Sequence, residues 1–353
     1  MSNTITLGKH SIGQGLPPFI IAEMSGNHNG SLDRALAIVD AVAQSGAHAL
    51  KLQTYTADSM TLDSDCPAFR INDINSPWHG RSLYSLYQQA ATPWEWHAPI
   101  FERARAKGLV VLSSPFDEKA ADFLHAHQVD CYKIASFENI DLPLIKKVAT
   151  LGKPVIISTG LASEAEIEEA VTTARNVGCK KVILLKCTST YPASPTDSNL
   201  RTIEHMRERF QCEVGLSDHT IGMGAAIASV AMGATVIEKH VTLQANDGGV
   251  DSAFSIDPQG LAQLVAETAH AAQAVGEVFY GATKSEQNAL HYRRSLYVTQ
   301  SMQKGELFSP SNIRAIRPNE GLPPKYIEQF IGKSATQNIA RGTPLEWKFI
   351  EKK

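Results

Sequence analysis

The sequence predicts an α/β protein, a (β/α)8 TIM barrel followed by a small β-rich domain. The first 280 residues alternate apolar, β-rich runs with amphipathic stretches, which is the pattern of βαβ units in a parallel sheet. Eight such runs can be counted, and eight units favour a closed barrel over an open sheet. No Gly-x-Gly-x-x-Gly fingerprint follows the first run, which argues against a dinucleotide-binding sheet.

Each predicted strand is a short, mainly apolar run. The eight runs are residues 18–25, 48–55, 109–116, 131–136, 154–160, 181–188, 212–219 and 235–242. Amphipathic stretches follow them, and in residues 32–44 and 164–176 apolar side chains recur at three- and four-residue spacing, as on one face of a helix. Each run with its following stretch is therefore predicted to form one βα unit.

One connection is longer than a normal loop. Residues 56–91, between the second and third strands, are rich in Asp, Asn, Ser and Pro and contain Trp78 and Tyr84. Connections of this length are uncommon in compact domains unless they have a function. This one leaves the rim at which barrel active sites lie, so we expect either a loop that covers the substrate or an insertion without a role.

The chain changes character after the predicted barrel. Residues 1–280 form the predicted catalytic domain, 281–290 a polar linker, and 291–353 a module of short strands separated by Gly, Pro and Asn. A module of about sixty residues is only marginally stable by itself, which favours its docking on a partner surface.

The composition is that of an ordinary globular protein with a sizeable core. The chain has 353 residues, of which 43% are hydrophobic and 20% charged, and its net charge is −3. This balance, without a long block of Lys or Arg, argues against a nucleic-acid partner. Five cysteines without a CxxC pair indicate neither a disulfide framework nor a cysteine zinc site.

A cytoplasmic location is expected. The N-terminus has no basic region followed by an apolar run, so no secretion signal is indicated. Eighteen apolar residues never follow one another without interruption, so no membrane span is expected. The cysteine usage also suits a reducing compartment.

Two histidines end the last two predicted strands. His219 closes the stretch Gly215-Leu-Ser-Asp-His, and His240 closes Val236-Ile-Glu-Lys-His about twenty residues later. In a parallel barrel, this spacing of strand, helix and strand puts both imidazoles side by side on one rim. Neutral imidazole is the commonest side-chain ligand for Mn, Zn or Fe, so the pair predicts half of a catalytic metal site. The alternative is that each histidine only caps its strand with a hydrogen bond.

Two lysines lie inside the predicted strands. Lys51 and Lys133 are placed where a buried, unpaired ammonium would be costly, so each needs an anion nearby. Together with serine and threonine hydroxyls at other strand ends, they predict a pocket for a small phosphate or carboxylate ligand. Two alternatives are a buried salt bridge to Glu23 or Glu138, and a Schiff base on Lys133 as in a class I aldolase.

The other polar candidates gather at the same ends of the strands. They are Glu23, Gln53, Ser114, Ser136, Glu138, Ser189, Tyr191, Ser217 and Glu238. Asp251 follows in a Gly-rich loop after the last strand, where it could complete the metal sphere or steer a substrate hydroxyl. Its alternative is an ordinary turn former, since loop aspartates often have that role.

At these residues the sequence resembles the sialic acid synthase family, over nearly the whole chain. The matching stretches are Ile21-Ala-Glu23 with Asn27-His28, Lys51-Leu-Gln-Thr54, Ser113-Ser-Pro-Phe116, Tyr132-Lys-Ile-Ala-Ser136, Cys187-Thr-Ser-Thr-Tyr-Pro192, Gly215-Leu-Ser-Asp-His-Thr220, Glu238-Lys-His240 and Ile316-Arg-Pro318. The resemblance implies a (β/α)8 barrel with a C-terminal antifreeze-like (SAF) domain. It also implies that two subunits exchange this domain in a homodimer, so that each SAF domain covers the partner's active site.

Within the family, two stretches are similar to the branch that makes pseudaminic acid. They are Gln53-Thr-Tyr-Thr-Ala-Asp-Ser-Met-Thr61 and Thr92-Pro-Trp-Glu-Trp-His97. The N-acetylneuraminate branch usually carries Gly at the position of Phe137 and Asn at that of Ser189. The resemblance implies condensation of phosphoenolpyruvate with 2,4-diacetamido-2,4,6-trideoxy-L-altropyranose and water, giving pseudaminic acid and phosphate. The alternatives are an N-acetylneuraminate or legionaminate synthase using another N-acetylated amino sugar, and a non-catalytic sugar-binding protein.

The resemblance also implies roles for individual residues. His219 and His240 would hold a divalent metal, Mn²⁺ or Mg²⁺. Glu138 would move a proton near the substrate, and Glu23 and Asp251 would orient the metal, a water or the sugar hydroxyls. Arg317 would reach from the partner's SAF domain to an N-acetyl group. The two substrates would be bound by Lys51, Gln53, Ser114, Lys133, Ser136, Ser189, Tyr191 and Ser217.

Overall fold

The computed structural model describes residues 4–74, 76 and 78–351. The chain divides into two compact units, residues 1–276 and 277–353. Each unit has its own core of buried apolar side chains.

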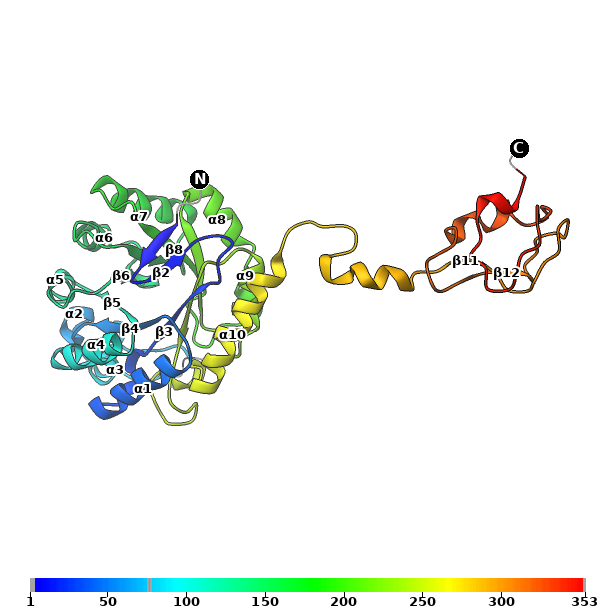
Figure 1. The fold of residues 1–353 in the computed structure, drawn as a ribbon. Helices are drawn as coiled ribbons and strands as arrows, with labels where there is room; N and C mark the ends of the chain where they lie inside the picture. The colour runs from blue at the N-terminus through cyan, green and yellow to red at the C-terminus, as the bar shows by residue number, and fades with distance from the viewer. Residues whose placement is uncertain (1–3, 75, 77, 352–353) are drawn as a thin grey trace. The chain divides into compact units, whose positions relative to one another are not determined.

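Eight parallel strands close the first unit into a barrel, so the predicted fold is confirmed (Figure 1). Around the barrel the strands follow the order β10-β3-β4-β5-β6-β7-β8-β9. They are β3 (Phe19–Glu23), β4 (Ala49–Thr54), β5 (Val110–Pro115), β6 (Cys131–Ile134), β7 (Val155–Ser158), β8 (Val182–Cys187), β9 (Glu213–Asp218) and β10 (Val236–His240). Each lies within one of the eight runs that the sequence predicts.

Helices surround these strands (Figure 1). They are α1 (Leu32–Gln44), α4 (His97–Ala106), α5 (Glu118–Ala126), α6 (Leu142–Ala149), α7 (Glu164–Asn176), α8 (Thr202–Phe210), α9 (Gly224–Ala231) and α10 (Pro258–Val275). α1 and α7 keep their predicted bounds because side chains cap their first turns: Ser31 accepts from Arg34 N, and Ser163 forms a capping box with Glu166. None of the helices in the described part of the chain has the length and hydropathy of a membrane span.

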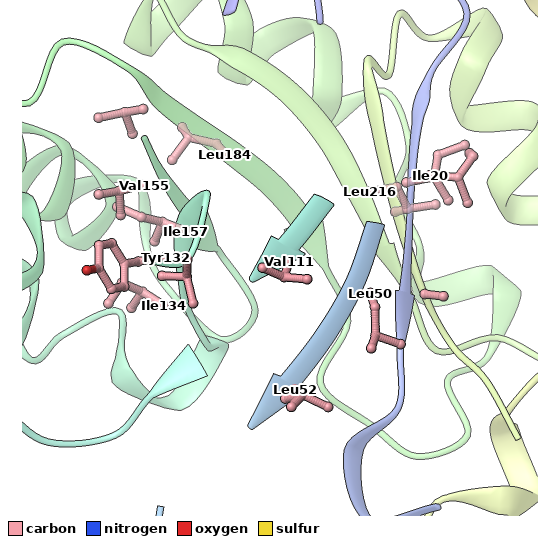
Figure 2. Close-up of a cluster of buried hydrophobic side chains, with 14 of the residues drawn as sticks. Ile20, Leu50, Leu52, Val111, Tyr132, Ile134, Val155, Ile157, Leu184 and Leu216 are labelled. Carbon is pink, nitrogen blue, oxygen red and sulfur yellow. The ribbon is translucent and has the colours of Figure 1, made fainter. Parts of the chain in front are cut away.

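Alternate strand residues face opposite sides of the barrel wall. One set packs against the helices, as Figure 2 shows for Leu50, Val111 and Leu184. The other set fills the barrel interior with apolar side chains: Phe19, Ile21, Ala49, Val110, Leu112, Cys131, Ile156, Ile183, Leu185 and Val236. Continuing the same alternation toward the C-terminal strand ends brings polar side chains into the interior, at Glu23, Lys51 and Ser114.

An antiparallel hairpin, which the sequence analysis did not predict, precedes the barrel. β1 (Ile5–Leu7) and β2 (His10–Ile12) are joined by a two-residue turn in which Gly8 has a positive φ of 55°. Ile5, Leu7 and Ile12 are buried in the same cluster as the apolar interior of the strands. The hairpin therefore closes the end of the barrel opposite the polar strand ends.

The long connection of residues 56–91 contains two short helices, α2 (Ala57–Met60) and α3 (Leu83–Ala90). Between them, the Trp78 indole N–H donates to the carbonyl of Val250, 3.1 Å away, in the loop that follows β10. The connection therefore lies at the rim formed by the C-terminal strand ends, where the sequence placed it. That it covers a substrate stays a prediction.

The second unit is a small β-rich fold. β11 (Ser295–Val298) pairs antiparallel with β12 (Ile313–Ile316), and Leu296, Phe308, Phe330 and other apolar side chains form its core. Most of the predicted linker is wound into a 3-10 helix, η7 (Lys284–Tyr292), whose first turn has a capping box formed by Thr283 and Glu286. The boundary between the two units lies between residues 276 and 277. The end of the barrel domain expected from composition was residue 280, four residues later.

Candidate functional site

Buried ionic side chains occupy the barrel interior at the C-terminal strand ends. Lys51 forms an ion pair with Glu23, and its Nζ lies 3.9 Å from Glu238 Oε1 and 3.5 Å from Ser114 Oγ. The pKa of Lys51 is raised: burial works against the charge, but the carboxylates of Glu23 and Glu238 outweigh it. The salt bridge to Glu23 that the sequence left as an alternative is therefore present for this lysine.

Lys133 has a different carboxylate partner from the two that the sequence offered. Its Nζ lies 3.7 Å from Glu238 Oε1, and Ser217 Oγ donates to the same oxygen at 3.2 Å. Burial, reinforced by repulsion from Lys51, lowers the pKa of Lys133 although Glu238 opposes the shift. Glu238 keeps a lowered pKa, because the two lysines outweigh the effect of its burial. Glu238 thus links both lysines across the barrel interior.

Hydroxyl groups from neighbouring strand ends form the next part of the site. Ser136, in the 3-10 helix η4 (Ser136–Glu138) after β6, accepts from the backbone N–H of Gly160 at 3.2 Å. A Cβ on Gly160 would lie 2.6 Å from Ser136 Oγ and closer still to Ser189 Oγ, so only glycine leaves room for both hydroxyls. The buried Asn139 amide donates to the carbonyls of Ser158 and Gly160 and holds this turn in place.

Glu138 lies at the end of η4, next to this group of hydroxyls along the chain. Its Oε2 is buried and has no hydrogen-bond partner among the described residues. Burial raises the pKa of Glu138 to about 7, although the charge of Lys133 acts in the opposite direction. A carboxyl with this pKa exists in both protonation states near neutral pH, as a group that moves a proton requires.

The two histidines lie side by side, as their spacing predicts. Their ring centroids are 5.3 Å apart. The Nδ1 of His219 is 3.0 Å from the carbonyl of Thr188, which can only accept, so in the neutral imidazole Nδ1 carries the proton and Nε2 has the lone pair. The Nδ1 of His240 is buried, has no hydrogen-bond partner in the described ranges, and lies 3.7 Å from Asp251 Oδ2. The pair thus offers two buried imidazoles, and a carboxylate, that of Asp251, lies near the one on His240.

These donors fit a divalent metal, although they do not form a closed site. The tautomer of His219 is fixed by a backbone carbonyl, which is how proteins commonly orient a metal-bound histidine. Across residues 4–74, 76 and 78–351, no group of three or more His, Cys, Asp and Glu side chains is arranged to hold a metal ion. The metal prediction therefore depends on two nitrogens, with Asp251 near one of them.

Aromatic rings line the region beside the histidines. The ring of Tyr191 lies 4.6 Å from that of His219, and Phe254 lies 5.0 Å from His240. Trp78, from the long connection, lies 5.8 Å from Tyr191. The aromatic side chains of three separate loops thus form a wall on one side of the histidine pair.

Two predicted site residues are not drawn into this network. Gln53 is half-buried on β4, paired in register with Ser114, and close in sequence to Lys51. Arg317 follows β12 in the second unit and is exposed there. Its assignment to the active site stays a prediction.

Several residues that the sequence analysis gave no role belong to the same region. Glu238 stood in a recognised motif, yet nothing in the sequence showed that it would bind both lysines. Cys187 Sγ lies 3.7 Å from Ser189 Oγ and 3.8 Å from His219 Nδ1, between the hydroxyls and the histidines. Gly160, Asn139 and Phe254 carried no sequence signal of their own.

Each of the two units matches a known protein family or domain. Residues 38–280 match the model of the NeuB family, and residues 293–351 match that of the SAF domain. The chain is 42% identical to the pseudaminic acid synthase of Campylobacter jejuni subsp. jejuni serotype O:2, over 93% of this chain and 95% of that protein. It is 41% identical to the pseudaminic acid synthase of Helicobacter pylori, over 95% of this chain and 98% of that one.

A solved structure shares the fold. The N-acetylneuraminic acid (sialic acid) synthetase of Leptospira borgpetersenii serovar Hardjo-bovis, in complex with citrate, superposes with a TM-score of 0.73 at 33% identity. The match covers 83% of this chain and 97% of the other.

Proposed function

Because the chain belongs to the NeuB family, we propose that it condenses phosphoenolpyruvate with 2,4-diacetamido-2,4,6-trideoxy-L-altropyranose. Water is the third reactant, and the products are pseudaminic acid and phosphate. The observation that carries this proposal is the pair of buried lysines beside two histidines and several hydroxyls, in a chain 42% identical to a pseudaminic acid synthase over 93% of its length. The site thus offers cations for an anionic substrate next to a place for an electrophile.

Phosphoenolpyruvate would be bound at the lysines. Lys51 and Lys133 would hold its charges, and the surrounding hydroxyls would donate to its oxygens in a partly dry setting. These hydroxyls are those of Ser114, Ser136, Ser189 and Ser217. C3 of phosphoenolpyruvate then adds to C1 of the open-chain sugar, water adds to the resulting cation at C2, and phosphate leaves with cleavage of its C–O bond.

The aldehyde of the sugar would lie near the histidine pair. A divalent metal held by His219 and His240, Mn²⁺ or Mg²⁺, would supply Lewis-acid polarisation of the aldehyde oxygen. Asp251 would orient water or a sugar hydroxyl there, since its Oδ2 lies 3.7 Å from His240 Nδ1. Tyr191 and Gln53 would contact the sugar from the neighbouring strand ends.

Glu138 is proposed to move the proton that the reaction requires. Its raised pKa, about 7, lets it give or take a proton near neutral pH. Glu23 is proposed to hold Lys51 in place, because the two form a buried ion pair.

The active unit is proposed to be a homodimer in which the SAF domain of one subunit covers the barrel of the other. Residues 277–353 contain 12 Lys and Arg against 7 Asp and Glu, whereas residues 1–276 contain 21 against 29, so the two parts carry opposite net charge. Loops at the C-terminal ends of the barrel strands expose apolar side chains that a partner could cover: Phe137, Leu161 and Ile221 are 58%, 74% and 71% exposed. Arg317 would then reach an N-acetyl group of the sugar bound by the partner subunit.

The test is phosphate release from phosphoenolpyruvate in the presence of a panel of amino sugars. The panel contains N-acetylmannosamine and the 2,4-diacetamido trideoxy sugars, and mass spectrometry identifies each product. We expect turnover only with metal and with the altropyranose, and phosphate release without any sugar-dependent product would reject the proposal. For the dimer, mixing inactive His219→Ala and Arg317→Ala subunits should restore activity, and failure to restore it would argue against exchange.

A class I aldolase is the second candidate, because burial lowers the pKa of Lys133 and so favours its neutral, nucleophilic amine. Borohydride reduction in the presence of pyruvate would then label Lys133. We expect no label, since the adjacent Glu238 opposes the loss of charge, and a label together with metal-independent activity would replace the synthase proposal.

A further inference from the structure

A second buried ion pair lies on the opposite face of the strands that carry the histidines. Asp218 and Lys239 are partners in the register between β9 and β10, one residue before His219 and His240 respectively. Lys239 Nζ lies 2.7 Å from Asp218 Oδ2, and each side chain is only 1% exposed. Because side chains alternate along a strand, this pair is on the helix side of the wall whereas the histidines are on the inner side.

The pair also fixes the chain on the far side of His219. Lys239 Nζ donates to the carbonyl of Thr220 at 2.6 Å. The other carboxylate oxygen of Asp218 accepts from the backbone N–H of Thr220 at 2.9 Å and from its hydroxyl at 2.8 Å. The residues before and after His219 are therefore both tied to Lys239, the neighbour of His240.

Stability does not account for this ion pair. Two residues earlier on the same faces of the two strands, Leu216 and Ile237 are completely or almost completely buried in the apolar core, and Figure 2 shows Leu216 among those side chains. Removing two charges from water is costly. Apolar residues of similar volume in such a position often give the protein equal or higher stability. A buried pair that holds two backbone segments in one register has a different use, which is geometric.

We propose that the Asp218–Lys239 pair is a positioning device that sets the spacing and direction of His219 and His240 for a divalent metal. The inference rests on the proposed function, which assigns the metal to these two histidines. Both side chains are on the helix side of the barrel wall, so they would act through the two histidines and not as metal ligands. Partners that orient metal ligands typically contribute about 10- to 100-fold to metal affinity, and we expect a contribution of that size here.

The decisive variant removes both charges at once. In the full-length protein, Asp218→Leu with Lys239→Met replaces the pair by apolar side chains of similar volume. We expect the Mn²⁺ dissociation constant, from electron paramagnetic resonance of free Mn²⁺ during titration, to rise by about 10- to 100-fold. The melting temperature should stay unchanged or rise, because the apolar pair fits the surrounding core.

A matched control separates positioning from general destabilisation. Leu216→Ala lies on the same strand and the same face as Asp218, and it should lower the melting temperature while leaving Mn²⁺ affinity unchanged. If affinity falls equally in Leu216→Ala, or if the double variant binds Mn²⁺ like the wild type, the inference is overturned. Should the double variant fail to fold, Asp218→Asn, which keeps the volume but removes the charge, must show the same loss of affinity.

The histidine variants test the underlying assignment separately. His219→Ala and His240→Ala should each abolish tight Mn²⁺ binding in the same titration. If they bind Mn²⁺ as the wild type does, the metal assignment fails, and the positioning inference fails with it. If they lose the metal but the double variant keeps it, only the positioning inference fails.

Discussion

Replacing Glu138 by Gln should lower activity and raise stability at the same time. The side chain is half-buried, its Oε2 is buried and unpaired among the described residues, and the burial raises its pKa to about 7. In the unfolded chain the same group has a pKa of 4.5. The folded protein therefore binds this proton more tightly than the unfolded chain does, so deprotonation favours unfolding.

The size of the effect follows from the two pKa values. The contribution of Glu138 to stability is fully present below pH 4.5. It is lost as the pH rises to about 7, the pKa of this group in the folded protein. A shift of this size corresponds to about 3 kcal/mol. We compare the free energy of unfolding of Glu138→Gln with that of the wild type at two pH values. The advantage of the variant over the wild type should be up to about 3 kcal/mol larger at pH 8 than at pH 4.

Activity should change in the opposite direction. A glutamine cannot move a proton, and loss of a general acid or base typically costs about 10²- to 10⁴-fold in rate. We expect kcat to fall by that factor, and the limb of the pH–rate profile near pH 7 should disappear. Denaturant titrations at pH 4 and pH 8, and steady-state phosphate release, provide the two measurements.

A carboxylate with the opposite shift provides the control. Glu166 is exposed in the capping box of α7, and hydrogen bonds from Ser163 lower its pKa. Glu166→Gln should show no gain of stability at pH 8 and no loss of activity. The reasoning is refuted if Glu138→Gln keeps wild-type kcat, or if its stability difference from the wild type does not depend on pH.

Three further substitutions test other parts of the site and fold. Gly160→Ala should displace the hydroxyls of Ser136 and Ser189 and lower kcat/KM for phosphoenolpyruvate about 100-fold, the loss expected for two hydrogen bonds to a charged ligand. The control is Gly224→Ala, where an added Cβ meets nothing within 4 Å, and it should leave kcat/KM unchanged. Equal kcat/KM values in the two variants would contradict the proposed phosphate pocket. His97 is buried, and burial lowers its pKa from 6.5 to about 4, so stability should fall by about 3 kcal/mol as the pH drops from 6.5 to 4. His97→Gln should flatten this dependence in denaturant titrations, and an unchanged slope would show that another group causes it. Trp78→Ala should raise KM for the amino sugar by up to about 10-fold without changing KM for phosphoenolpyruvate, because contacts on an aromatic face contribute about 0.5–1.5 kcal/mol. A rise in both KM values would indicate a general collapse of the rim.

The strands could be predicted because both of their faces are buried and apolar. Residues such as Leu50 and Val111 face the helices, while Ala49 and Val110 fill the barrel, so each strand reads as a continuous apolar run bounded by polar ends. The helix bounds of α1 and α7 were predictable for a local reason, since Ser31 and Ser163 supply their own caps. Local chemistry of this kind is visible in a single sequence.

The hairpin of β1 and β2 was not predictable in the same way. Its strands have three residues each, too few to show a period, and Ile5 and Ile12 are buried only because a barrel end lies beneath them. The partner of Lys133 was missed for a related reason. Glu238 is on β10 and Lys133 on β6, so their contact depends on how the barrel closes and not on any sequence spacing.

The two glutamates beside the lysines differ in a way that matters for binding an anion. Burial raises the pKa of Glu23 against the pull of Lys51, whereas Glu238, held between two lysines, keeps a lowered pKa. Neighbouring carboxyl groups whose environments shift their pKa values in opposite directions usually have different roles. In the proposed reaction, Glu238 would remain the counter-ion of Lys51 and Lys133. Glu23, which pairs with Lys51 in this structure, would take up a proton when the anionic substrate competes for Lys51, so that no second buried carboxylate is left unpaired.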